Sequence, residues 1–214
     1  MTPALAGQAP APAGQARLAI LDRDGTIIDV VRDEETGAIS VAFHPSHLRL
    51  LPGAVEGMRM LQDAGFVLAI ATNQPGPAKG QYGAAAVKAT NEALVERLSQ
   101  EGLRIAGVEV CMHHPDGGPG GDPALAGPCD CRKPRPGMLE RLAVRLGADR
   151  AASWMIGDGA GDLEAGRGAG LRTALVFAKN RCELCPLRGG PAGLTPDVHG
   201  PTLRDIAEAI LRQG

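Results

Sequence analysis

Short apolar runs that alternate with helical patterns constrain the fold of this chain more than any other feature. Five runs are interpreted as strands: residues 17–22, 66–72, 107–112, 153–158 and 173–177. They are apolar almost throughout rather than at every second position, which is typical of strands covered on both faces of a parallel sheet. Apolar residues at helical spacing predict helices over residues 53–64, 84–100, 136–146 and 202–212.

This alternation predicts an α/β fold with a doubly wound, Rossmann-like parallel sheet and right-handed crossovers. Ligands bind such sheets at the carboxyl ends of the strands, so chemistry is expected there. Two stretches interrupt the pattern: residues 30–43 are predicted to form a hairpin, and residues 114–128 a Gly- and Pro-rich loop. We predict one domain over residues 17–214, preceded by a disordered leader over residues 1–16 that is rich in Ala, Pro and Gly.

Composition restricts the partners that this chain can bind. Its net charge of -2 and its 2% of aromatic residues argue against nucleic acid as a partner. No apolar run has the length of a membrane span, and the first residues do not resemble a signal peptide. Five cysteines without an export signal favour metal binding or free thiols over disulfides. We therefore expect a cytoplasmic monomer that binds a small molecule.

Acidic residues follow two of the predicted strands. Asp22 and Asp24 end the first run in the sequence DRDGT, and residues two apart on an extended chain point the same way. Asp158 and Asp162 follow the fourth run in the sequence GDGAGD, on a strand that is expected to neighbour the first. Carboxylates gathered at one edge repel one another unless a cation lies between them. Mg²⁺ is the cation that suits carboxylate and phosphate oxygens.

Polar residues at two further positions complete a pattern for phosphoryl transfer. Thr72, Asn73 and Gln74 end the second run and offer hydroxyl and amide groups, and Lys133 in the sequence CRKP offers a cation. A nucleophilic carboxylate, a metal and donors to phosphoryl oxygens are what in-line transfer requires. Taken singly, DRDGT has a turn as its alternative interpretation, and GDGAGD resembles a dinucleotide-binding loop except that Asp162 replaces its last glycine.

These motifs resemble the four motifs of the haloacid dehalogenase superfamily of phosphohydrolases: DRDGT, the Thr of ATNQ, the Lys of CRKP, and GDGAGD. The stretches TNQPGPAKG, CMHHP and CDCRKPRPGM are similar to the histidinol-phosphatase-like subgroup. The resemblance covers residues 18–177 and implies a capless fold with a zinc-binding loop.

The resemblance also implies a role for each motif residue. The catalytic residues would be Asp22 as nucleophile, Asp24 as general acid and base, and Thr72 and Lys133 as phosphate-binding groups. Mg²⁺ would bind Asp22, the backbone carbonyl of Asp24, and Asp158, with Asp162 in support. Asn73, Gln74 and Arg132 would contact the substrate.

Four residues form a candidate zinc site: Cys111, His113, Cys129 and Cys131. Three thiolates and one imidazole are a closed set of ligands of the kind that structural Zn²⁺ prefers, although free thiols are the alternative. Arg132 and Lys133 follow Cys131 directly, so we hypothesise that zinc positions these two cations. Cys182 and Cys185 have no evident partner ligands and are interpreted as free cysteines.

The expected function is Mg²⁺-dependent hydrolysis of a small sugar phosphate through an aspartyl-phosphate. The resemblance favours D-glycero-D-manno-heptose 1,7-bisphosphate, cleaved at position 7, and leaves histidinol phosphate or another sugar phosphate as alternatives. A phosphotransferase and a non-catalytic, zinc-stabilised binding protein also remain open.

Overall fold

A six-stranded sheet organises the computed structural model, which describes residues 15–32, 35, 37–177 and 191–213. The strand order is β5-β4-β1-β6-β7-β8, and every neighbouring pair is parallel. The strands are β1 (Leu18–Leu21), β4 (Val67–Asn73), β5 (Ile105–Cys111), β6 (Trp154–Gly157), β7 (Arg172–Val176) and β8 (Val198–Gly200). All five predicted strands are confirmed. The sequence did not indicate β8, a strand of only three residues at the edge of the sheet.

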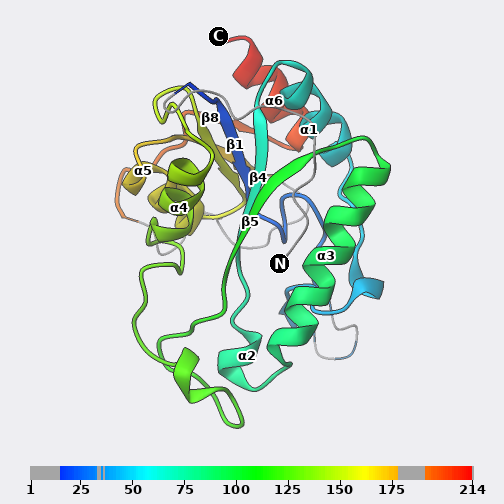
Figure 1. Cartoon of the computed structure of the whole chain (residues 1–214), viewed down its shortest axis with the longest axis vertical. Helices are drawn as coiled ribbons and strands as arrows, with labels where there is room; N and C mark the ends of the chain where they lie inside the picture. The colour runs from blue at the N-terminus through cyan, green and yellow to red at the C-terminus, as the bar shows by residue number, and fades with distance from the viewer. Residues whose placement is uncertain (1–14, 33–34, 36, 178–190, 214) are drawn as a thin grey trace.

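Helices cover both faces of the sheet, which confirms the doubly wound fold (Figure 1). One face is covered by α1 (Ala54–Asp63), α3 (Ala84–Gln100) and α6 (Leu203–Leu211), and the other by α4 (Gly137–Arg145) and α5 (Ala160–Gly168). The predicted helices match α1, α3, α4 and α6 to within about two residues, whereas α5 and the single turn α2 (Gly76–Lys79) were not predicted.

Side chains of β1 show why its sequence is apolar at every position. Ala19 and Leu21 belong to the core beneath α1 and α6, whereas Leu18 and Ile20 belong to the core beneath α4. All four residues are completely buried. Successive side chains of a strand point to opposite faces, so a central strand with two covered faces needs apolar residues throughout.

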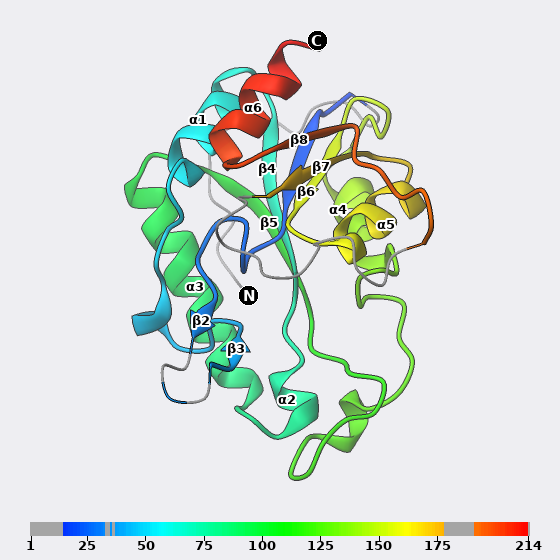
Figure 2. The ribbon, with the colours of Figure 1, turned by 180° about the vertical axis from the view of Figure 1, so that it is seen from behind.

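The predicted hairpin is confirmed: β2 (Val31–Arg32) pairs antiparallel with β3 (Ile39–Ser40). In Figure 2 the hairpin, α2 and the loop between β5 and α4 extend beyond the same end of the sheet. The loop contains one 3-10 turn, Pro123–Leu125, and another 3-10 turn, Pro45–His47, follows the hairpin. These segments therefore surround the end at which β4 and β5 finish.

The beginning of the domain differs from the prediction by one residue. Ala16, assigned to the leader, is buried and forms a parallel bridge with Ala148, because its backbone exchanges hydrogen bonds with residues 147 and 149. The rest of that leader up to residue 14, and the pair Cys182 and Cys185, lie outside the described residues. Among the described helices, none has both the length and the apolar character that a bilayer crossing requires.

Candidate active site

A cleft of about 210 Å³ opens at the carboxyl ends of β1, β4 and β6. Asp22 follows β1 directly and Asp158 follows β6, while Thr72 and Asn73 end β4. Because β1 lies between β4 and β6 in the sheet, the ends of all three strands meet at one place. The residues lining the cleft are Asp22, Asp24, Val41, Thr72, Asn73, Lys133, Asp158, Gly161 and Asp162.

Three carboxylates meet in this cleft, and Lys133 forms ion pairs with two of them. Asp22, Asp158 and Asp162 have carboxylate oxygens within 4.8 Å of one another. Burial raises the pKa of Asp22 to about 7 even though Lys133 opposes the shift, and the neighbouring carboxylates add to it. Burial, together with the charges of Asp22 and Asp162, raises the pKa of Asp158 to about 8. The group therefore favours a proton or a metal cation.

Gly25 allows this close approach of two strands' ends. It adopts a left-handed conformation with φ of 88°, and a Cβ atom at this position would lie 2.1 Å from Oδ2 of Asp158. Any side chain would displace the Asp158 carboxylate and strain the backbone. The glycine of DRDGT is thus required by packing against the fourth motif, as well as by the turn.

Lys133 is a buried cation that lines the cleft. Its Nζ lies 2.6 Å from Oδ1 of Asp22 and 2.6 Å from Oδ1 of Asp162, and it donates a third bond to the carbonyl of Ala71 at 2.7 Å. Burial lowers the pKa of Lys133, but Asp162 and Asp22 together outweigh it and raise the pKa above its ordinary value. Lys133 therefore stays charged and holds Asp22 in place.

Asp162 and Asn73 fix the position of Lys133. Oδ2 of Asp162 accepts from the backbone N–H of Gly159 at 3.1 Å, which ties this carboxylate to the N-terminus of α5. The side-chain amide of Asn73 donates to the carbonyl of Lys133 at 3.0 Å and accepts from its N–H at 3.1 Å. The amide of Asn73 thus binds the protein backbone, although the residue also lines the cleft.

The structure places Gln74 differently from the sequence-based expectation that it contacts substrate. Its side chain is fully buried and does not line the cleft. Nε2 of Gln74 donates to Oδ2 of Asp24 and to Oγ1 of Thr72, at 2.8 Å in each case. Gln74 therefore joins two residues that line the cleft and does not line it itself.

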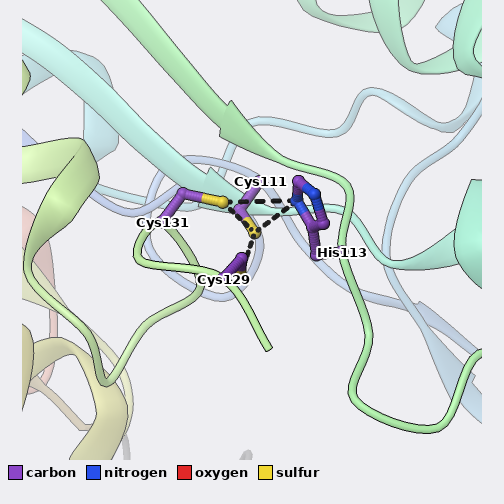
Figure 3. A group of neighbouring side chains, drawn as sticks. All are labelled: Cys111, His113, Cys129 and Cys131. Atoms are coloured by element: carbon purple, nitrogen blue, oxygen red, sulfur yellow. Dashed lines mark hydrogen bonds between the residues drawn. The ribbon is translucent and has the colours of Figure 1, made fainter. Parts of the chain in front are cut away.

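The four predicted zinc ligands form a second cluster (Figure 3). Sγ of Cys111 lies 2.8 Å from Sγ of Cys131 and 3.8 Å from Sγ of Cys129, and Nδ1 of His113 lies 3.4 Å from Sγ of Cys131. Burial raises the pKa of the Cys111 thiol, so a thiolate at this position needs a cation. Three sulfurs and one ring nitrogen within 4.8 Å of one another fit a tetrahedral metal ion.

This cluster ties the sheet to the loop that carries Lys133. Cys111 ends β5, whereas Cys129 and Cys131 come from the segment that returns to α4. Arg132 donates its N–H to Sγ of Cys129 at 3.4 Å and its Nη1 to the carbonyl of His113 at 3.4 Å. Arg132 does not line the cleft, in contrast to Lys133 beside it.

Arg23 and Asn91 belong to the site and were not identified from the sequence. Arg23 is fully buried and binds both oxygens of Asp24, and Asn91 on α3 binds Arg23. A charged residue between the two aspartates that follow the first apolar run was a signal for the first. An asparagine on the apolar stripe of a helix was a signal for the second.

Three comparisons relate the chain to known proteins. Residues 130–181 match the family model for HAD-hydrolase-like proteins. The chain is 36% identical over 159 residues to the D-glycero-beta-D-manno-heptose-1,7-bisphosphate 7-phosphatase of Pseudomonas aeruginosa, covering 74% of this chain and 80% of the relative. It is 33% identical over 199 residues to the enzyme of the same name from Escherichia coli K12, covering 90% and 93%.

A solved structure agrees with both relatives. The D,D-heptose 1,7-bisphosphate phosphatase of B. bronchiseptica, complexed with magnesium and phosphate, superimposes with a TM-score of 0.72 at 30% identity. The match covers 92% of this chain and 99% of the other.

Proposed function

Because the chain belongs to the haloacid dehalogenase superfamily, and within it to the family of heptose 1,7-bisphosphate 7-phosphatases, we propose that it is a Mg²⁺-dependent phosphatase of this substrate. The proposed reaction removes phosphate from position 7 of D-glycero-D-manno-heptose 1,7-bisphosphate. The observation that carries the proposal is the buried contact of Lys133 with Asp22 and Asp162 beside two further carboxylates in one cleft.

Asp22 is the proposed nucleophile. Lys133 binds one of its oxygens and thereby orients the carboxylate toward the cleft. A carboxylate oxygen of Asp22 forms a bond to phosphorus as the bond to the sugar oxygen breaks, and the product is an aspartyl-phosphate. Lys133 and the hydroxyl of Thr72 stabilise the charge that develops on the phosphoryl oxygens.

Asp24 is the proposed general acid and base. It gives a proton to the departing sugar oxygen, and it then removes a proton from the water that hydrolyses the aspartyl-phosphate. Inorganic phosphate leaves, and both carboxyl groups return to their initial states. Removal of a general acid costs roughly 10²–10⁴-fold in rate, so the orientation of Asp24 is expected to matter.

The carboxylates are suited to hold Mg²⁺. Asp22, Asp158 and the backbone carbonyl of Asp24 are the proposed ligands, since hard oxygen donors with raised pKa values favour a hard divalent cation. Bound there, Mg²⁺ would neutralise the carboxylates and the phosphoryl oxygens. The solved relative that contains magnesium and phosphate supports this assignment.

Zn²⁺ at Cys111, His113, Cys129 and Cys131 is proposed to be structural. A closed set of four ligands leaves no position for substrate, and the cluster lies outside the cleft. Its proposed effect is to order the segment that ends in Arg132 and Lys133, and Arg132 would then recognise the sugar phosphate. Thiols used as metal ligands also support the expected cytoplasmic location, and we propose a monomer.

Phosphate release from several substrates tests the proposal. The full chain, loaded with Mg²⁺, would be assayed with the β-anomer of heptose 1,7-bisphosphate and with histidinol phosphate, and Asp22→Asn would be the blank. Phosphorus NMR of the product would identify the position that is cleaved. Preference for the heptose at position 7 is the expected result. Preference for histidinol phosphate would change the substrate assignment, and an inactive protein would refute the enzymatic proposal.

A further inference from the structure

The carboxylate of Asp24 is held by donors from three separate segments. Oδ2 accepts from Nε of Arg23 at 2.9 Å and from Nε2 of Gln74 at 2.8 Å. Oδ1 accepts from the N–H of Ala42 at 2.8 Å and from Nη2 of Arg23 at 3.2 Å. These four hydrogen bonds fix the plane of the ionised carboxylate before any substrate binds, and one of them gives way when Asp24 carries the proton that it donates.

Arg23 needs anchors of its own to hold Asp24 in one orientation. Its side chain is 0% exposed, so each guanidinium N–H requires an acceptor inside the protein. Nη1 donates to Oδ1 of Asn91 at 2.5 Å, and Nη2 also donates to the carbonyl of Ala42. Asn91 therefore provides the acceptor by which α3 fixes the far end of the guanidinium.

Helix packing alone does not explain an asparagine at position 91. Asn91 is buried at 8% exposure, on the same stripe of α3 as the core residues Val87, Leu94 and Leu98. Asparagine has a low helix propensity, and its side-chain amide costs free energy when it is buried without a partner. The hydrogen bond from Arg23 satisfies the amide oxygen and explains why an asparagine is tolerated at this buried position.

We propose that Asn91 is a positioning residue for acid–base catalysis, acting on Asp24 through Arg23. This inference rests on the proposed function, because it assumes that Asp24 transfers protons during phosphate ester hydrolysis. Loss of the anchor frees the guanidinium to rotate, and the carboxyl group of Asp24 then loses its alignment with the leaving oxygen. Misplacement by about 1 Å can cost on the order of 10²-fold in rate.

The leaving group provides a readout that a purely structural role would not affect. A sugar alkoxide departs with a proton from Asp24, whereas p-nitrophenolate departs without one. The constant kcat/KM reports the steps up to loss of the leaving group. A variant with a misaligned Asp24 should therefore lose kcat/KM on the sugar phosphate and retain most of it on p-nitrophenyl phosphate.

The experiment compares Asn91→Leu with Thr90→Val, both with Mg²⁺ bound. Thr90 is a matched control because it is the preceding residue on α3, is 0% exposed, and donates from Oγ1 to the carbonyl of Ala86 within the same helix. We expect Asn91→Leu to lower kcat/KM on the heptose bisphosphate about 10–100-fold, with a much smaller loss on p-nitrophenyl phosphate. Thr90→Val should leave both values unchanged.

Two further variants keep the test decisive. Asn91→Asp retains an oxygen acceptor for Arg23 and should recover most of the activity on the sugar phosphate. Should Asn91→Leu not fold, Asn91→Ser is the substitute, because its hydroxyl is too short to replace the amide oxygen. Equal losses on both substrates, or no loss in a folded variant, would overturn the inference. A wild-type protein inactive on all phosphate esters would instead refute the proposed function.

Discussion

Replacing Lys133 by methionine should destabilise the metal-free protein strongly. The substitution keeps the length of the side chain but removes the cation that lies 2.6 Å from carboxylate oxygens of both Asp22 and Asp162. Both carboxylates are buried, so water cannot replace the lost ion pairs. Removing one partner of a buried pair costs about 3–5 kcal/mol in free energy of unfolding, and two carboxylates place the expected loss near the upper value.

The loss in free energy of unfolding caused by Lys133→Met should depend on Mg²⁺ and on pH. A cation bound by the carboxylates replaces part of the missing charge, so Mg²⁺ should stabilise Lys133→Met more than the wild type. At saturation near 100 times its Kd, a ligand adds roughly 2.7 kcal/mol. Lower pH should also reduce the loss. Burial raises the pKa of Asp22 in the native state above its value in the unfolded state, so the native state holds a proton at pH values where the unfolded state has released it. Loss of Lys133 should raise this native-state pKa further. The variant should therefore become more stable as the pH falls.

Urea unfolding at pH 5 and pH 8, with chelator and with Mg²⁺, would measure these effects. Lys88→Met is the control, since Lys88 is 76% exposed and lies 3.8 Å from Glu92, and a surface pair contributes at most about 1 kcal/mol. A Lys133→Met variant whose stability at pH 8 in chelator equals that of Lys88→Met would refute the reasoning. So would a loss that grows as the pH falls.

Three further predictions concern zinc and glycine positions. Cys131→Ser should remove bound zinc, measured by atomic emission, and lower both the thermal midpoint and phosphatase activity; unchanged activity would contradict a positioning role for zinc. Gly121→Ala should reduce activity and stability because a Cβ atom there would lie 1.9 Å from a carbonyl oxygen of α2, whereas Gly83→Ala, with open space around it, should change neither. Gly25→Ala should weaken Mg²⁺ binding, measured by calorimetry, by displacing the Asp158 carboxylate, and unchanged affinity would contradict the close packing described for this loop.

The sequence alone predicted the order and type of most elements. Continuous apolar runs such as residues 17–22 identified buried parallel strands, because a strand that is covered on both faces carries apolar side chains on both. The carboxylates and Thr72 were identified because strand ends in such a fold meet at one edge, and Lys133 was identified from the sequence CRKP. The local sequence pattern was sufficient to predict these strands and helices, since the residues of each element determine which of its faces can be buried.

The strand β8 and the helix α5 were not predicted from the sequence, because contacts with distant residues stabilise them. The strand β8 has only three residues and pairs with β7, and its place in the sheet depends on that pairing. The helix α5 is Gly-rich and begins with a cap in which Asp162 accepts from the N–H of Gly159. Tertiary contacts stabilise both elements, whereas their intrinsic propensities are weak.

Only the tertiary structure showed which residues hold the groups that line the cleft. The sequence placed Gln74 among the residues that contact substrate, but its neighbours in space make it a link between Asp24 and Thr72. Arg23 and Asn91 are 68 positions apart, and no pattern along the chain relates them. The motif carboxylates and Thr72 can be found from local pattern because they lie at or just after strand ends. The partners that orient those groups come from distant segments and are fixed only when the core packs.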